Sequence, residues 1–204
     1  MTPASQAPFV LASSSATRLR VLRDAGIHPE AVVSGVDETT EDGLDTAAAV
    51  AVLAERKADA VALLRPGALV LGCDSLLDLD GEALGKPGTA QRAAALWHRL
   101  SGRQGTLFTG HCLIEPRTRR RAQGVGRTVV RFGRPSDAEI AAYVASGEPL
   151  ALAGGFSLDG LGAPFVEGID GDPGNVLGLS LPLLRHLLAE LGVAITDLWQ
   201  ARPC

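Results

Sequence analysis

The chain has 204 residues, of which 46% are hydrophobic and 4% aromatic, and it carries a formal net charge of -4. This length and apolar content suffice for a buried core in one domain or in two closely joined lobes. The acidic balance and the scarcity of aromatic rings argue against broad nucleic-acid binding, which depends on many cations and on stacking surfaces.

No apolar run reaches the ~18 residues that a membrane-spanning helix needs, and residues 1–6 lack the basic start and apolar stretch of a signal peptide. We therefore expect a cytoplasmic protein without a membrane partner. The three cysteines, Cys73, Cys112 and Cys204, show no C-x-x-C spacing. Neither a disulfide framework nor a zinc site is expected from them.

The first patterned segment is an apolar strand over residues 8–12, followed by hydroxyl side chains and a cation where a helix over residues 14–25 begins. Free amide groups and the positive end of the helix dipole favour an anion there, and Ser13, Ser15 and Arg18 add donors and charge. A phosphate site is one interpretation. A plain helix cap is the other, since serine is a preferred capping residue, and the segment alone favours neither.

The next elements alternate between apolar strands and amphipathic helices, which indicates an α/β protein. Up to residue 100 we expect a strand over 30–34, an acidic loop over 36–42, a helix over 45–64, a buried strand over 68–79, a hairpin return over 82–84 and a helix over 89–100. The hairpin prediction rests on the Asp80-Gly81 dipeptide.

Beyond residue 100, two strands over 105–114 and 126–132 are expected to pair around residues 115–123. A helix over 136–145 should begin at a capping box made by Ser136 and Glu139. The glycine-rich stretch 154–178 predicts loops around a short hairpin, and residues 181–191 predict a last helix.

Asp74 stands inside the predicted central strand, just past a run of apolar residues. A carboxylate in such a place is costly unless it is paired, bound to a metal or held at a cleft, so Asp74 is a candidate functional group. The alternative is an acid in a strand-end turn that accepts hydrogen bonds from backbone amides.

Three more charged residues have both a functional and an ordinary interpretation. Lys86 lies on a glycine-flanked loop that is not a Walker A motif but still allows a lysine to reach a phosphate. Glu38 lies in the acidic loop, where solvation is the default and Mg²⁺ binding the alternative. Lys57 lies among other charged helix residues, and the sequence alone favours an exposed side chain.

The arginine-rich run at residues 117–121 follows Pro116 and lies between two predicted strands. This position favours a solvated hairpin tip over a nucleic-acid site. The four histidines are scattered, so zinc-protease and serine-hydrolase sites are not expected.

Eight segments occur in an order that is more specific than any one of them: residues 11–18, 35–38, 57–58, 72–75, 85–87, 100–102, 153–156 and 171–182. In this order the chain resembles the Maf family of nucleoside triphosphate pyrophosphatases, whose fold is similar to that of inosine triphosphate pyrophosphatases. The resemblance implies a single domain over 1–204, with a long twisted mixed sheet, flanking helices and two lobes around a central cleft.

The resemblance also implies roles for the candidate residues. Asp74 would be the proton acceptor in a catalytic set with Lys57 and Lys86, and Glu38 and Asp74 would hold a divalent metal cation, Mg²⁺ or Mn²⁺. Substrate-binding roles would fall to Ser13, Ser15, Arg18, Ser75 and Asp159. The products would be a nucleoside monophosphate and pyrophosphate.

A homodimer and a role in cleansing the nucleotide pool or arresting cell division are further implications. The alternative is a nucleotide-binding regulator of cell division without significant turnover.

The chain departs from the family pattern at a few positions. Thr17 stands where a second cation is common, Gly105 replaces a frequent histidine, and Ser75 stands where threonine is frequent. Asp159 falls where relatives that prefer thymidine or uridine triphosphates have glutamine. Because a carboxylate only accepts hydrogen bonds, Asp159 would favour the donor-rich edge of guanine over uracil.

Overall fold

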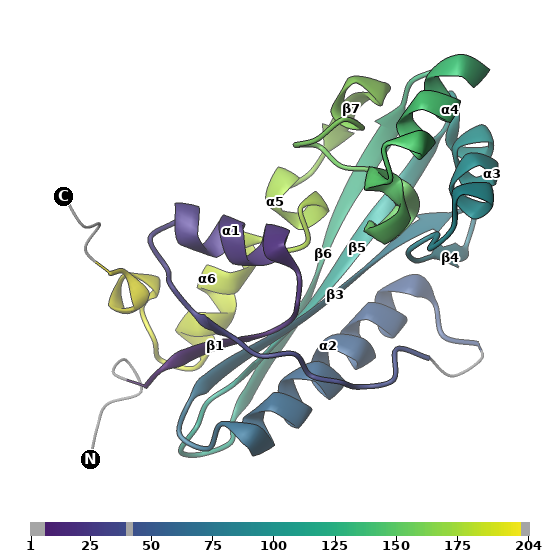
Figure 1. Ribbon diagram of the computed structural model, residues 1–204. Coiled ribbons are helices and arrows are strands. Elements are labelled where there is room, and N and C mark those ends of the chain that lie inside the picture. Colours follow the sequence, from purple (N-terminus) through teal and green to yellow (C-terminus); the bar gives the residue numbers. More distant parts are fainter. Residues whose placement is uncertain (1–6, 40–42, 201–204) are drawn as a thin grey trace.

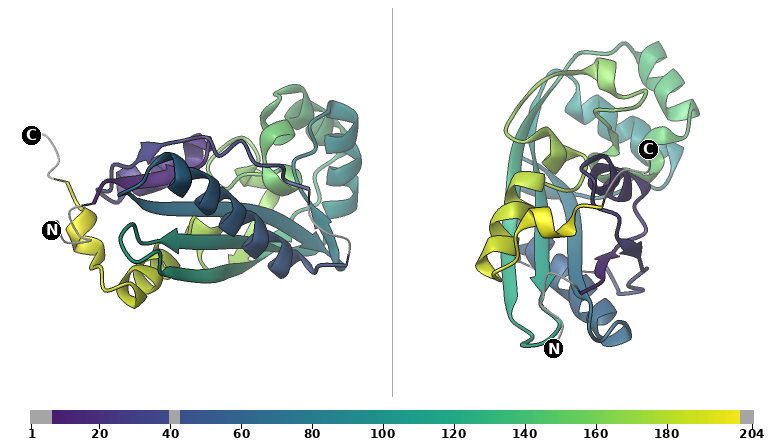
Figure 2. Two further views of the ribbon diagram at one scale, coloured as in Figure 1. Left: turned by 90° about the horizontal axis from the view of Figure 1, so that it is seen from below. Right: turned by 90° about the vertical axis from the view of Figure 1, so that its left-hand side faces the viewer.

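A long twisted sheet runs through the molecule and carries helices on both of its faces (Figures 1 and 2). The computed structural model describes residues 7–39 and 43–200, so residues 1–6, residues 40–42 of the predicted acidic loop and Cys204 lie outside the described residues. Seven strands form the sheet, in the order β2-β1-β3-β5-β6-β7 with β4 beside β3. Strands β1, β2 and β3 are parallel and the other pairs are antiparallel, which confirms the predicted α/β class with a mixed sheet.

The strands are β1 (Phe9–Ala12), β2 (Glu30–Ala31), β3 (Leu69–Leu79), β4 (Glu82–Leu84), β5 (Gln104–Ile114), β6 (Arg121–Phe132) and β7 (Val166–Asp170). The helices are α1 (Ala16–Asp24), α2 (Thr46–Leu64), α3 (Ala90–Leu100), α4 (Asp137–Ala145), α5 (Pro173–Val176) and α6 (Leu181–Glu190). Short 3-10 turns are η2 (Glu148–Ala151), η3 (Ala153–Gly155), η4 (Ala163–Phe165) and η5 (Ile195–Leu198).

Local sequence determines where the main helices begin. The side chains of Asp45 and Thr89 cap α2 and α3 by accepting a hydrogen bond from the amide three residues later. Ser136 and Glu139 form the predicted capping box of α4. These helices confirm the sequence predictions to within a residue at their starts.

Two predictions in the second half were wrong. The stretch 154–178 contains no hairpin of its own, because its one strand, β7, pairs with the distant β6 instead. Strand β6 begins at residue 121 rather than 126, and Gly124 and Gly126 lie within it. A Cβ atom at these glycines would come within 2.9 Å of Leu183 and 2.2 Å of Asn175, so they reflect close packing and not a loop. Strand β2 is also shorter than the predicted 30–34.

The core divides into three clusters because successive strand residues point to opposite faces. On β1, Phe9 and Leu11 pack with α1 and α6, whereas Val10 and Ala12 pack beneath α2. The third cluster surrounds the buried Trp97 at the other end of the sheet, where α3 and α4 lie (Figure 1). The cluster of Phe9 and Leu11 and the cluster around Trp97 therefore lie at opposite ends of the sheet.

One edge of β3 has a gap that defines this site. Strand β1 pairs with β3 as far as Gly72, and β4 pairs with β3 from Leu77 onward. On that side, residues 73–76 of β3 have no strand partner among the described residues. Asp74 and Ser75 lie in the gap, and their side chains point to opposite faces of the sheet.

Candidate active site

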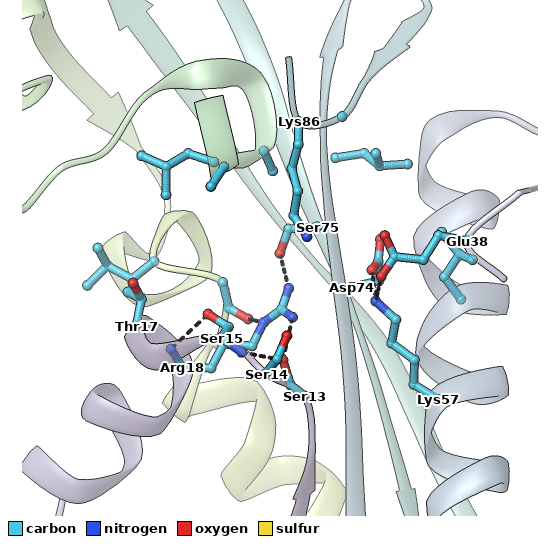
Figure 3. A pocket seen from close by; sticks show the side chains of 18 of the residues that line it. Ser13, Ser14, Ser15, Thr17, Arg18, Glu38, Lys57, Asp74, Ser75 and Lys86 are labelled. Atoms are coloured by element: carbon cyan, nitrogen blue, oxygen red, sulfur yellow. Dashed lines mark hydrogen bonds and ion pairs between the residues drawn. The ribbon is translucent and has the colours of Figure 1, made fainter. Parts of the chain in front are cut away.

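A cleft of about 820 Å³ opens at the gap beside β3. Its walls come from the start of α1, from α2, from the loop after β4 and from the segment between η2 and η4. All of the residues singled out from the sequence line it: Ser13, Ser15, Arg18, Glu38, Lys57, Asp74, Ser75, Lys86 and Asp159. Figure 3 shows most of these side chains from close by.

The start of α1 brings Arg18 into the wall of the cleft. Ser15 caps this helix and accepts a hydrogen bond from the amide of Arg18, so the same residues begin the helix and build the site. The Arg18 side chain is buried, with 9% of the residue exposed. Its guanidinium donates to the Gly178 carbonyl at 2.7 Å, the Ser75 hydroxyl at 2.8 Å and the Ser13 hydroxyl at 3.2 Å.

These three acceptors are all uncharged. A buried cation is normally paired with an anion, because desolvating an unpaired charge is costly. The structure gives Arg18 hydrogen bonds but no carboxylate within its described residues. Among the described residues, no anion is therefore hydrogen-bonded to the guanidinium, although Glu38 lies close enough across the cleft for the charge of Arg18 to lower its pKa.

On the opposite face of β3, Lys57 lies between two carboxylates. Its Nζ atom is 2.5 Å from Asp74 and 2.6 Å from Glu38 (Figure 3). The side chains of Lys57 and Asp74 are only 8% and 10% exposed, so the expectation of an exposed Lys57 was wrong. Helix α2 packs this face against the sheet, and the charges near Lys57 in sequence lie on the other faces of the helix.

The Glu38 side chain contacts Lys57 from the solvent side and is 52% exposed. The hydrogen bond from Lys57 holds the pKa of the Glu38 carboxyl below its usual value, against the opposing effect of burial. The charges of Lys86 and Arg18 lower this pKa as well. Glu38 is thus an ionised carboxylate throughout the neutral range.

Two glycines set the distance between α2 and the sheet. A Cβ atom on Gly72 would lie 2.1 Å from the Ala54 carbonyl oxygen, and one on Gly110 would lie 2.1 Å from the Val50 carbonyl oxygen. Only glycine allows the helix backbone to approach this closely. The close approach places Lys57 within hydrogen-bonding distance of Asp74.

Two further predicted residues extend the site. Lys86 reaches into the cleft toward Ser75 from the loop after β4 (Figure 3). The Ser75 hydroxyl lies 3.0 Å from that of Thr109 on β5. Asp159 lies at the mouth of the cleft and forms an ion pair with Arg20 of α1.

Glu38 and Asp74 are two carboxylates of the cleft that lie close together, since both contact Lys57 Nζ. Among the described residues, no group of three or more His, Cys, Asp or Glu side chains is arranged to hold a metal ion. Two carboxylates nevertheless suit Mg²⁺ or Mn²⁺ bound to a polyphosphate, since Mg²⁺ takes one or two carboxylates and completes its shell with phosphate oxygens and water. The neighbouring Cys73 points to the opposite face of β3 from Asp74, where it is fully buried in the hydrophobic core, and burial raises the pKa of its thiol to about 12.

Two members of the site were missed by the sequence predictions. The Gly178 carbonyl accepts from Arg18 across 160 residues of chain, and Thr109 supports Ser75 from a neighbouring strand. Gly178 has no local signal, since a backbone carbonyl contributes to the site only through the path of the chain. Thr109 pairs with Ser75 in the β3–β5 register. The sequence predicted both strands but not this register, so it could not place the two hydroxyls side by side.

Comparisons with known proteins give a consistent result. Residues 8–191 match the family of Maf-like proteins. A nucleoside triphosphate pyrophosphatase of Streptomyces avermitilis is 57% identical over 205 residues, which cover 99% of each chain. One of Streptomyces coelicolor is 58% identical over 98% of each chain.

Among solved structures, the Ham1 protein of Staphylococcus aureus overlaps 62% of this chain and 72% of its own, with 16% identity and a TM-score of 0.44. In the part of the chain that the structure describes, no helix is long and apolar enough to cross a membrane.

Proposed function

Since this chain belongs to the Maf-like protein family and is a nucleoside triphosphate pyrophosphatase, we propose that it releases pyrophosphate by attack of water on the α-phosphorus. A new bond forms between the water oxygen and the α-phosphorus, and the bond from this phosphorus to the α,β-bridging oxygen breaks. Asp74 accepts a proton from the attacking water. The products are a nucleoside monophosphate and pyrophosphate.

The observation that carries this proposal is the buried Arg18 with its three uncharged acceptors. A triphosphate would supply an anion in direct contact with this guanidinium. Ser13 and Ser15 add hydroxyls at the helix start, where the dipole also favours an anion. Ser75 and Lys86 complete the phosphate side of the cleft in this proposal.

Lys57 orients the Asp74 carboxylate through the 2.5 Å contact and keeps it beside Glu38. Glu38 and Asp74 are the residues that would hold Mg²⁺ or Mn²⁺. When bound, such an ion offsets the charge of the phosphate oxygens and withdraws electron density from phosphorus. The contribution of the chain is positioning: the carboxylates are fixed by α2 and β3 before the substrate arrives.

Base preference belongs to the same proposal. Asp159 would accept hydrogen bonds from the N1–H and N2–H₂ groups of guanine, which uracil does not offer in that arrangement. Because Arg20 already engages this carboxylate, the base must share it or displace the arginine. We expect a higher kcat/KM for GTP than for UTP, and a smaller ratio between them in Asp159→Gln.

The test is pyrophosphate release from a panel of nucleoside triphosphates, with Mg²⁺, with Mn²⁺ and with a chelator. We expect release that needs the cation, and a kcat below a tenth of the wild-type value in Asp74→Asn. A folded Asp74→Asn variant that retains more than a tenth would remove Asp74 from the proton-accepting role. Nucleotide binding by the wild-type chain without release from any triphosphate would favour the regulator of cell division instead.

A homodimer and a role in nucleotide-pool cleansing remain proposals that rest on family membership alone. The proposed partner is a nucleoside triphosphate rather than nucleic acid. Part of the basic run is engaged within the molecule, since Arg121 pairs with Glu55 and Asp59 of α2, and Arg120 donates to the Glu190 carbonyl.

A further inference from the structure

Glu148, the first residue of η2, is a carboxylate that the proposed reaction does not use. It is half-buried and accepts four hydrogen bonds. Its Oε1 atom accepts from the Tyr143 hydroxyl at 3.0 Å, the Ser157 hydroxyl at 2.9 Å and the Gly162 amide at 3.1 Å. Its Oε2 atom accepts from the Leu161 amide at 2.8 Å.

Three of these four donors belong to residues 157–162, which we call the rim loop. The backbone of the rim loop passes close to the Glu148 carboxylate. A Cβ atom on Gly160 would lie 2.4 Å from Glu148 Oε2, and one on Gly162 would lie 2.5 Å from the Tyr143 hydroxyl oxygen. At this point the backbone of the rim loop lies close enough for the Leu161 and Gly162 amides to donate to the carboxylate.

The charge state of Glu148 supports the same view. Burial acts to raise the pKa of its carboxyl, but the hydrogen bonds from the Leu161 and Gly162 amides hold that pKa below the usual value. Hydrogen bonds to an ionised acceptor are shorter and stronger than neutral ones. One ionised side chain thus ties the end of α4 to two backbone amides and a hydroxyl of the rim loop.

The rim loop also faces the substrate cleft. Ser157 and Asp159 line it, and Asp159 reaches Arg20 on the opposite wall. The cations proposed for the triphosphate, Arg18 and Lys86, come from other segments of the chain. Once the triphosphate occupies those cations, the rim loop is one of the polar parts of the wall that remain for the nucleoside, together with Thr17 and Ser34.

We propose that Glu148 is a positioning residue that holds the rim loop in the shape in which Ser157 and Asp159 meet the nucleoside part of the substrate. This inference rests on the proposed function, because it assumes that the triphosphate lies at Arg18 and Lys86. It assigns Glu148 to recognition of the nucleoside and leaves the chemical step unaffected.

The test measures binding rather than turnover, with two probes. The first is a guanosine triphosphate analogue with a methylene group in place of the α,β-bridging oxygen, and the second is inorganic tripolyphosphate. In Glu148→Gln, one acceptor oxygen becomes an NH₂ group that faces other donors. We expect the Kd of the analogue to rise at least five-fold, while that of tripolyphosphate stays within two-fold of wild type.

Glu139→Gln is the matched control. Glu139 also accepts two hydrogen bonds in the same part of the molecule, from the amide and hydroxyl of Ser136, but it does not line the cleft. The Glu139→Gln variant should have a lower Tm but the same Kd as wild type for both probes. Gly160→Ala is a second, independent variant, because its Cβ would lie 2.4 Å from Glu148 Oε2 and would force the carboxylate and the rim loop apart, whichever of them moves. The pattern expected for Glu148→Gln should recur.

An unchanged Kd for the analogue in both rim variants would overturn the inference, as would an equal loss for both probes. A wild-type chain that binds the analogue with this dependence on Glu148 but hydrolyses no triphosphate would sink the proposed activity and leave the role of Glu148 standing. A wild-type chain that does not bind the analogue would contradict both.

Discussion

Arg18 is a buried cation whose hydrogen-bond acceptors are all uncharged, and its planar donor group meets three of them at once. A lysine at this position would keep the charge but lose the fixed fork of donors. The serine hydroxyls and the Gly178 carbonyl hold the guanidinium in place, so its orientation is set before a ligand binds.

We therefore predict that Arg18→Lys raises KM for nucleoside triphosphates at least ten-fold, because a flexible ammonium does not reproduce the oriented contacts. Steady-state pyrophosphate release measures this change. Arg23→Lys is the control, since Arg23 is exposed in the last turn of the same helix. Equal KM values for the two variants would show that Arg18 is not part of the triphosphate site.

How far the site could be predicted differs from residue to residue. Ser13, Ser15 and Arg18 could be found because a helix start with hydroxyls and a cation is a local pattern. Lys57 could not be distinguished from its charged neighbours, since only the packing of α2 decides which face of that helix is buried. Their roles remain predictions, because the structure shows proximity and not turnover.

At the scale of elements, the candidate active site depends on how closely α2 approaches β3 and β5. Gly72 and Gly110 allow the helix backbone to lie almost against the strands, and Lys57 reaches Asp74 as a result. A larger residue at either position would push the helix outward, because backbone atoms cannot move aside as a flexible side chain can.

We predict that Gly72→Ala lowers the free energy of unfolding by about 2 kcal/mol or more, as overpacked sites typically do. It should also lower kcat, because Lys57 and Asp74 move apart. Gly124→Ala is the matched control in another strand. Its Cβ would meet the end of the Leu183 side chain, which can turn away. Urea unfolding measures the change in stability of each variant, and pyrophosphate release measures the change in kcat. Equal effects of the two variants would contradict this account.

The elements themselves were largely predictable up to residue 153, where hydrophobic periodicity and capping residues agree. Prediction failed for β7 because its partner, β6, lies 34 residues or more earlier in the chain and no local pattern reports that pairing. The start of β6 was misjudged because glycine usually marks a loop. Here Gly124 and Gly126 make room for α6 and α5.

At the scale of the whole molecule, His111 couples the sheet to α6. Its Nε2 atom accepts from the Ser180 amide at 3.0 Å, which leaves Nδ1 to donate to the Thr109 carbonyl at 3.0 Å. Burial lowers the pKa of His111 to about 4, with the charge of Arg18 acting in the same direction and the Thr109 hydrogen bond and Asp172 acting against it. Folding therefore favours the neutral ring.

Because the folded pKa lies below the unfolded value of 6.5, the unfolded chain binds the proton first, and stability falls as the pH is lowered from 6.5 toward 4. We predict that the free energy of unfolding falls by about 2 kcal/mol between pH 6.5 and 5, because each pH unit between the two pKa values costs about 1.4 kcal/mol. His111→Gln, which keeps an acceptor for Ser180, should remove this loss. Identical pH dependence of the two proteins in urea unfolding would contradict the prediction.

The central claim for the molecule is that water attacks the α-phosphorus within the cleft between the two ends of the sheet. Hydrolysis of GTP in ¹⁸O-labelled water with Mg²⁺, followed by mass spectrometry of the products, tests it most directly. We predict guanosine monophosphate that carries one labelled oxygen, together with unlabelled pyrophosphate. Label in the pyrophosphate, or guanosine diphosphate and inorganic phosphate as the products, would contradict the claim.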